Sequence, residues 1–418
     1  MQKYDSFTLD NGLRVIAQPL SAFRSTAVGI WVRAGSVDEA AENNGYSHFI
    51  EHLLFKGTGK RTARDLAEEM DLLGGQVNAF TSKECTCYHA KVMDEQFSGA
   101  LDLLSDLVIG AKFDPDDIER EKGVVLEEIA MVEDSPEDVV HDLIATATFG
   151  DNPLAQTILG PGENIENATR ESILAYKRNL YNPENCVLSV AGSYDIKNLK
   201  ELAENYLGGW SGGGQSARTA CDSSDKKQLY REKQIEQAHI CLGFDGVKQG
   251  DDRLYPLSIF SSILGGGMSS RLFQKIREEL GLAYTVYSYP SSYTDIGALN
   301  IYAGTSPKNV QLVIDTIAGE IKKMNADGIT DDEFAKAKTQ LKGSYILSQE
   351  STVARMNAIG RGLLMSGYAK TEEETIAKIE ATTKDDVMDM MRFVIASPMS
   401  AALIGSDCKA DYSPLMAL

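Results

Sequence analysis

Two of the chain's five histidines lie four residues apart, in the stretch HFIEH at residues 48–52. On a helix His48 and His52 would share one face, and Glu51 would project beside them because it follows His48 by three residues. Two imidazoles one turn apart are a standard way to bind zinc, and a neighbouring carboxylate can accept a proton from water at the metal. With five histidines and 61 acidic residues in the chain, chance would produce this arrangement only about 0.007 times per sequence. The stretch therefore predicts a zinc site.

A catalytic zinc ion takes three protein ligands and keeps one position open, so a further ligand is expected from elsewhere in the chain. An acidic segment beginning at Asp114 and Pro115 is expected to be helical, because aspartate caps helices and proline suits the first turn. Its inward apolar stripe comprises Ile118, Val124, Val125, Ile129, Met131 and Val132. Glu121 and Glu128 fall inside this stripe, where a carboxylate is costly unless a metal or another partner pairs with it. The alternative is that the stripe is misplaced and both carboxylates face solvent.

The same order of elements occurs twice, on either side of a Gly- and Ser-rich stretch at residues 208–227. In each half a strand is followed by two helices and two further strands. The ranges are 25–35, the motif helix, 63–75, 77–82 and 86–92, then 237–246, 253–267, 270–281, 283–292 and 297–305. This pattern predicts an α+β fold of two similar domains, each a mostly antiparallel sheet packed with helices on one side. We place the domains at 1–210 and 229–418, with a linker at 211–228.

The two halves differ where chemistry is expected. When Tyr46 is aligned with Tyr255, the positions of His48, Glu51 and His52 are occupied by Leu257, Phe260 and Ser261. The second half keeps the helix and lacks its polar groups. We therefore interpret it as a degenerate repeat without zinc ligands.

Composition excludes several classes of function. The net charge of −20 argues against a nucleic-acid partner. The apolar runs are too short to span a membrane, and the N-terminus lacks the features of a signal peptide, so we expect a cytoplasmic protein. Six cysteines are too few for a disulfide scaffold. Cys85 and Cys87 would share a strand face, and we interpret them as small buried residues rather than as a metal or redox pair.

The motif HFIEH with Glu128, and the stretches NNGYSHFIEHLLFKGT, GGQVNAFTSKE and TILGPGENI, resemble the pitrilysin or insulinase family of zinc metallopeptidases. The resemblance covers nearly the whole chain and is closest to the half-size branch that includes the β subunit of mitochondrial processing peptidase. It implies an endopeptidase acting on peptides or unfolded segments. It also implies that His48, His52 and Glu128 bind one zinc ion per chain, that Glu51 is the general base, and that Glu121 is a supporting carboxylate.

The resemblance assigns roles to two further groups of residues. Asn78, Ala79 and Phe80 would lie on a sheet edge to which an extended peptide adds itself as a strand, whereas the sequence alone favours an interior strand here. Arg277 and Tyr284 would hold the substrate backbone and stabilise the developing oxyanion.

The resemblance also bears on assembly, because full-length members of the family carry four such domains and this chain has two. Two copies are expected to form a homodimer in which the zinc motif of one subunit faces Arg277 and Tyr284 of the other. Two alternatives stay open: a non-catalytic scaffold or regulatory subunit of a larger complex, and a peptidase active only with a different partner subunit. The sequence does not distinguish zinc from manganese or cobalt.

Overall fold

The structure is a computed structural model that describes residues 4–214, 218, 220–222 and 225–417. The described residues form two compact units. The first combines residues from 1–129, 157–219 and 346–373, and the second combines residues from 130–156, 220–345 and 374–418. Each unit is built around its own sheet, which confirms the α+β prediction.

The first unit contains a six-stranded sheet in the order β1-β2-β6-β3-β5-β4. Its strands are β1 (Asp5–Thr8), β2 (Arg14–Pro19), β3 (Ser25–Val32), β4 (Gln76–Thr81), β5 (Thr86–Met93) and β6 (Cys186–Gly192). β2 and β6 pair in parallel and the other neighbours are antiparallel. β4 pairs with β5 and forms one edge of the sheet, so the expectation of an interior strand at residues 77–82 is wrong.

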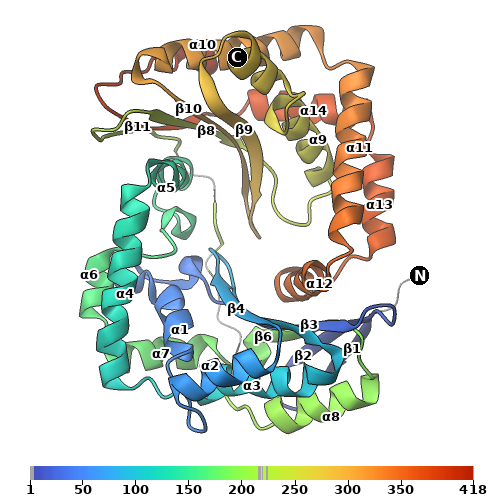
Figure 1. Ribbon diagram of the computed structural model, residues 1–418. Helices are drawn as coiled ribbons and strands as arrows, with labels where there is room; N and C mark the ends of the chain where they lie inside the picture. The colour runs from blue at the N-terminus through green and yellow to red at the C-terminus, as the bar shows by residue number, and fades with distance from the viewer. Residues whose placement is uncertain (1–3, 215–217, 219, 223–224, 418) are drawn as a thin grey trace. The chain divides into compact units, whose positions relative to one another are not determined.

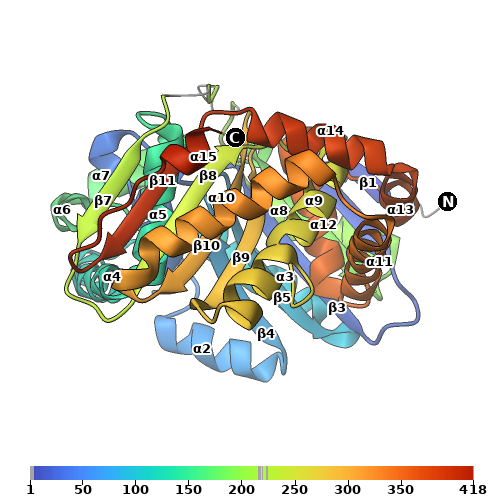
Figure 2. The same cartoon turned by 90° about the horizontal axis from the view of Figure 1, so that it is seen from above.

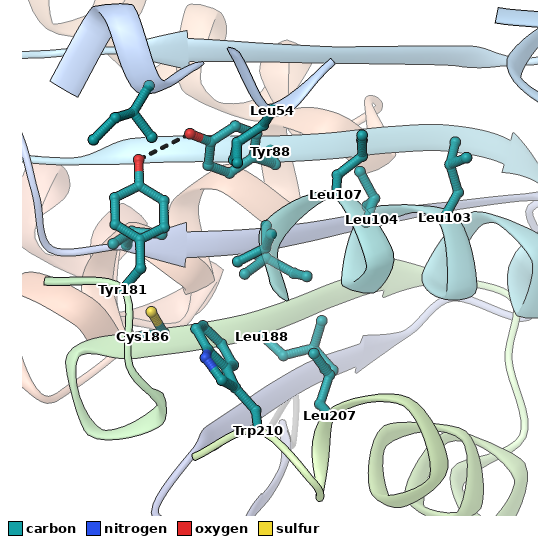
Figure 3. Packing of buried hydrophobic residues seen from close by; sticks show 14 of the residues in the cluster. Leu54, Tyr88, Leu103, Leu104, Leu107, Tyr181, Cys186, Leu188, Leu207 and Trp210 are labelled. Atoms are coloured by element: carbon teal, nitrogen blue, oxygen red, sulfur yellow. Dashed lines mark hydrogen bonds between the residues drawn. The ribbon is translucent and has the colours of Figure 1, made fainter. Parts of the chain in front are cut away.

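Helices cover one face of this sheet. They include α1 (Tyr46–Leu54), α3 (Phe97–Gly110), α7 (Arg170–Leu180) and α8 (Ile196–Leu207), with α2 (Ala63–Leu72), α6 (Gly162–Asn167) and the first part of α4 (Pro115–Asp134) alongside. Side chains alternate along β3, so Val28 and Ile30 meet these helices whereas Trp31 faces the other way. The core between the sheet and these helices contains two buried tyrosines, Tyr88 and Tyr181, which form a hydrogen bond with their hydroxyl oxygens 2.9 Å apart (Figure 3).

The second unit contains a five-stranded sheet in the order β7-β11-β8-β10-β9. Its strands are β7 (Gln228–Glu232), β8 (Ala238–Asp245), β9 (Ala283–Ser292), β10 (Gly297–Thr305) and β11 (Ser400–Gly405). Only β7 and β11 pair in parallel among these described strands. Helices α9 (Leu254–Gly265), α10 (Val310–Asp327) and α14 (Lys384–Ile395) pack on one face (Figure 2).

The second half also contains the helices α11 (Asp331–Ser348), α13 (Glu372–Ala381) and α15 (Ser413–Met416), in addition to α12, which is described below. The segment 270–281, which was expected to be an ordinary helix, contains instead the π-helix η6 (Phe273–Glu279). Short 3-10 turns occur at Ser36–Asp38, Ala41–Asn43, Asp94–Gln96, Pro153–Ala155, Pro183–Asn185 and Pro307–Asn309. No helix among the described residues is both long and apolar enough to cross a bilayer.

The two halves of the sequence exchange one helix each (Figure 1). Helix α5 (Pro136–Phe149), from the first half, packs on the second sheet through Val139, Val140, Ile144 and Ala147. Helix α12 (Thr352–Ser366), from the second half, packs on the first sheet, where Met356 and Ile359 meet Trp31. The sequence pattern does not predict this exchange. The boundaries 1–210 and 229–418 therefore stay a prediction about the repeat, whereas each compact unit draws on both halves. The predicted linker at 211–228 lies partly outside the described residues.

Candidate metal centre

Contacts at Gly45 hold the start of helix α1 in place, and this determines the direction in which the HFIEH side chains project. Gly45, just before the helix, has a φ of 104°, and a Cβ there would collide with the carbonyl oxygen of Leu159. The carboxylate of Glu39, only 4% exposed, accepts hydrogen bonds from the backbone N–H of Gly45 and of Ser47, both at 2.7 Å. A carboxylate at this end of a helix is favoured by the helix dipole.

One side of α1 is anchored in the core of the first unit. The side chains that anchor it are Phe49, Ile50, Leu53 and Leu54, each at most 1% exposed. His48, Glu51 and His52 project from the rest of the helix surface, as the spacing predicts. The packed side therefore holds the three polar groups in a set direction.

The structure brings His48, His52 and Glu128 together. The Nε2 atom of His48 lies 3.6 Å from Oε2 of Glu128, and the Nε2 atom of His52 lies 3.4 Å from the same oxygen. One ligand atom from each of the three residues lies within 4.8 Å of the other two. Two imidazole nitrogens and a carboxylate oxygen are a donor set that suits zinc and leaves a position open. The residues present therefore fit the metal that the sequence predicts.

Glu121, the other carboxylate predicted from the α4 stripe, lies behind His52 rather than in the cluster. Its Oε1 is 2.9 Å from Nδ1 of His52 and its Oε2 is 2.8 Å from Nζ of Lys56. A histidine that bonds a carboxylate through Nδ1 is held in the ring orientation that leaves Nε2 free for a metal.

The stripe on α4 is narrower than the sequence indicated. Ile118, Glu121 and Val125 are buried, whereas Val124 is 50% and Met131 is 72% exposed. The prediction that Val124 and Met131 face inward is wrong, because α4 presents only one narrow row of side chains to the rest of its unit. Glu128 lies on that row, seven residues after Glu121.

Burial shifts the pKa of two groups at the centre, His48 and Glu51. It lowers the pKa of His48 to about 4, with a smaller effect in the same direction from His52, so His48 is neutral near pH 7 and can ligate a metal. Burial also raises the pKa of Glu51, and a hydrogen bond from the Thr81 hydroxyl opposes that shift. A carboxyl with a raised pKa is better suited to accept and return a proton.

A pocket of about 340 Å³ opens beside these groups in the first unit. It is lined by Glu51, His52, Phe55, Lys56, Met70, Val77, Asn78, Ala79 and Glu121. Asn78 and Ala79 thus lie at the pocket, and their role in binding a peptide stays a prediction. Phe80 does not line it: its ring packs at 5.7 Å from that of Trp31, on the opposite face of the sheet.

Arg277 and Tyr284 contact each other in the second unit. Arg277 lies on η6, and its guanidinium carbon is 4.3 Å from the ring centroid of Tyr284, at the start of the edge strand β9. Tyr284 is 75% exposed. Their role toward the metal centre stays a prediction.

Three residues at the centre were missed by the sequence analysis: Glu39, Thr81 and Lys56. A signal existed for Lys56, because it follows His52 by four residues and so continues the same helix face. Thr81 lies within the stretch NAFTS, but its partner Glu51 becomes its neighbour only through the fold. No local pattern marks Glu39.

Comparisons with known proteins agree with this geometry. Residues 14–162 match the family model described as insulinase (peptidase family M16), and residues 167–341 match the model described as the peptidase M16 inactive domain. The uncharacterized zinc protease YmxG of Bacillus subtilis is 43% identical over 398 residues, which is 95% of this chain and 97% of that protein. An uncharacterized zinc protease of Streptomyces coelicolor is 39% identical over 412 residues, or 95% of this chain and 88% of that one.

Two solved structures share the fold. The crystal structure of a protease from Helicobacter pylori matches with a TM-score of 0.90 at 22% identity, covering 97% of this chain and 99% of that one. A peptidase M16 inactive domain from Pseudomonas fluorescens matches with a TM-score of 0.90 at 19% identity, covering 98% of this chain and 100% of that one.

Proposed function

Because this chain belongs to peptidase family M16, the insulinase family, we propose that it is a zinc-dependent endopeptidase that hydrolyses peptides or unfolded segments. The observation that supports this most strongly is the convergence of two imidazole Nε2 atoms and one carboxylate oxygen beside a second, separately held carboxylate, that of Glu51. The same convergence is the reason to retain zinc, one ion per chain, as the proposed cofactor.

His48, His52 and Glu128 would hold the metal. A bound zinc ion would supply Lewis acidity, which makes water a nucleophile near neutral pH and polarises a carbonyl. Glu51 takes the proton of the attacking water and passes it to the leaving amine. Thr81 fixes the orientation of the Glu51 carboxylate, and Glu121 fixes that of the His52 ring.

The peptide would bind along β4. This strand forms an edge of its sheet, so its outer backbone groups are not paired with another strand of that sheet. The N–H of Ala79 donates to Oδ1 of Asn78 at 2.8 Å, a local bond that an added strand would replace. Asn78 and Ala79 would provide these main-chain contacts beside the pocket. Phe80, whose side chain packs away from the pocket, would contribute through its backbone alone.

Arg277 and Tyr284 are proposed to stabilise the oxyanion, since a fixed cation and a phenol donor suit negative charge on a tetrahedral intermediate. We further propose that two copies of the chain form a homodimer in which each site uses the zinc ligands of one subunit and the Arg277–Tyr284 pair of the other.

The test is hydrolysis of an internally quenched peptide by the purified chain. We expect cleavage that stops when a chelator removes the metal and returns when zinc is added in slight excess. A zinc-loaded chain that leaves a broad peptide library intact would contradict the proposal. It would favour a scaffold role, or a peptidase that needs a different partner subunit, and addition of candidate partners would separate those two.

A further inference from the structure

Lys56 lies one turn beyond His52, just after the end of α1. The chain continues there in a tight turn, because the N–H of Phe55 donates to the carbonyl of His52 at 3.3 Å and that of Lys56 to Leu53 at 3.1 Å. The side chain of Lys56 therefore follows the face that carries the histidines, and it reaches Glu121 on α4.

The carboxylate of Glu121 is almost fully enclosed, with a side chain only 5% exposed. Each oxygen has its own partner: Oε1 meets Nδ1 of His52 at 2.9 Å and Oε2 meets Nζ of Lys56 at 2.8 Å. Among the described residues, Lys56 is the only lysine or arginine in ion-pair contact with Glu121. A buried carboxylate that loses its cation is strongly destabilised, because neither water nor another charge replaces it.

We propose that Lys56 is a positioning residue of the metal centre, which acts on His52 through Glu121. The ammonium group holds one oxygen of Glu121, so that the other is presented to Nδ1 of His52 and the Nε2 atom faces Glu128. The contact of Lys56 with Glu121 and that of Glu121 with His52 are both direct, and His52 is a proposed metal ligand. The inference rests on the proposed function, since it assumes that this cluster binds zinc.

An ordinary surface ion pair would not have this effect. Exposed pairs contribute little, because water replaces the lost partner. Here only the lysine end is accessible, at 36% exposed, while the carboxylate end is enclosed. Removal of Lys56 therefore leaves an enclosed oxygen of Glu121 without a partner and releases the carboxylate that orients His52.

The first measurement is the zinc dissociation constant of the purified, metal-free protein, obtained by competition with a chromophoric chelator at fixed pH. Lys56→Met keeps the length of the side chain and removes its charge, and we expect zinc binding to weaken by about 10- to 100-fold. Lys56→Arg retains a cation and should stay within about threefold of wild type. Lys60→Met is the matched control, because the Lys60 side chain is 69% exposed and its ion pair is long, with Nζ 4.0 Å from Oδ1 of Asp102. The zinc affinity of this variant should be unchanged.

A double-mutant cycle separates positioning from general damage. If Lys56 acts through Glu121, Lys56→Met should add less than about threefold to the loss already caused by Glu121→Gln, because the two changes remove the same link. If Lys56→Met weakens zinc binding as much in the Glu121→Gln variant as it does in the wild type, the proposal is overturned. Thermal unfolding of the metal-free variants verifies that each is folded, and Lys56→Gln, which keeps a hydrogen-bond donor, replaces Lys56→Met if the latter does not fold.

The outcomes for the two proposals are distinct. A wild-type chain with no measurable zinc affinity would overturn the proposed function, and with it the role of Lys56. Tight binding by wild type and equally tight binding by a folded Lys56→Met would overturn the role of Lys56 alone. As a second readout, Co²⁺ bound to Lys56→Met should show altered visible absorption, whereas Co²⁺ bound to Lys60→Met should match wild type.

Discussion

The hydroxyl of Thr81, on the edge strand β4, donates a hydrogen bond to the carboxylate of Glu51, on helix α1. Thr86, on the neighbouring strand, places its own hydroxyl oxygen 3.3 Å from that of Thr81. The strand that we propose binds the peptide is thus tied directly to the group that we propose takes the proton. The hydrogen bond from Thr81 to Glu51 would therefore support both peptide binding and proton transfer.

Thr81→Val tests this support. Valine has nearly the same shape but cannot donate to Glu51, and loss of a hydrogen bond to a charged group should lower kcat by about ten- to a hundredfold with little change in KM. Thr81→Ser, which keeps the hydroxyl, should retain most of the activity. Steady-state kinetics on one quenched peptide measure both, and a valine variant with unchanged kcat would show that the bond is dispensable.

Glu128→Gln tests the third ligand. A neutral amide oxygen is a much weaker zinc donor than a carboxylate, so the purified variant should contain well below one zinc ion per chain. Its neighbour Glu127 is exposed and lies outside the cluster, so Glu127→Gln is the control and should keep its metal. Metal analysis of both proteins decides the matter; full zinc content in Glu128→Gln would mean that the ligand set is wrong.

The face of α1 and the row on α4 could be predicted because both depend on local spacing. Residues three, four and seven apart share a helix face whatever the rest of the chain does. The α4 stripe was nevertheless drawn too wide, since Val124 and Met131 are apolar yet exposed. Which carboxylate on that row meets the histidines depends on where α4 packs, and spacing alone does not determine this.

Contacts that depend on the tertiary fold could not be predicted. Thr81 has no distinctive pattern around it, and the spacing of Lys56 from His52 indicates its helix face but not its partner. Their partners Glu51 and Glu121 lie on other elements. The edge position of β4 depends on sheet order rather than on its own residues. The helix exchange was missed for the same reason: the apolar faces of α5 and α12 indicate burial, but not which sheet buries them.

Gly360→Ala tests the packing of α12 on the first sheet. A Cβ at Gly360 would lie only 2.6 Å from Oγ of Ser189 and even closer to Nε1 of Trp31, two atoms that form a buried hydrogen bond of 2.9 Å. Overpacking at this contact should lower the free energy of unfolding by about 1–3 kcal/mol. Gly343→Ala on α11, where a Cβ meets nothing within 4 Å, should be neutral or slightly stabilising. Urea unfolding compares the two, and equal stability would contradict the observed packing of α12.

Mixing two inactive variants tests the shared site of the proposed homodimer. His52→Ala removes a zinc ligand and Arg277→Ala removes the proposed oxyanion group. If sites are shared, subunit exchange creates mixed dimers in which one site carries both lesions and the other carries none. Half of the dimers are mixed, so about a quarter of wild-type activity should return. No recovery after exchange has been verified would show that each chain builds its own site.

The most direct test of the central claim is Glu51→Gln, measured for both zinc content and peptide hydrolysis. The substitution removes the proposed base while leaving His48, His52 and Glu128 in place. We predict about one zinc ion per chain, as in wild type, together with a fall in kcat of about 10²- to 10⁴-fold. Glu127→Gln again serves as the control and should be fully active. Substantial turnover by zinc-loaded Glu51→Gln would contradict the proposed mechanism.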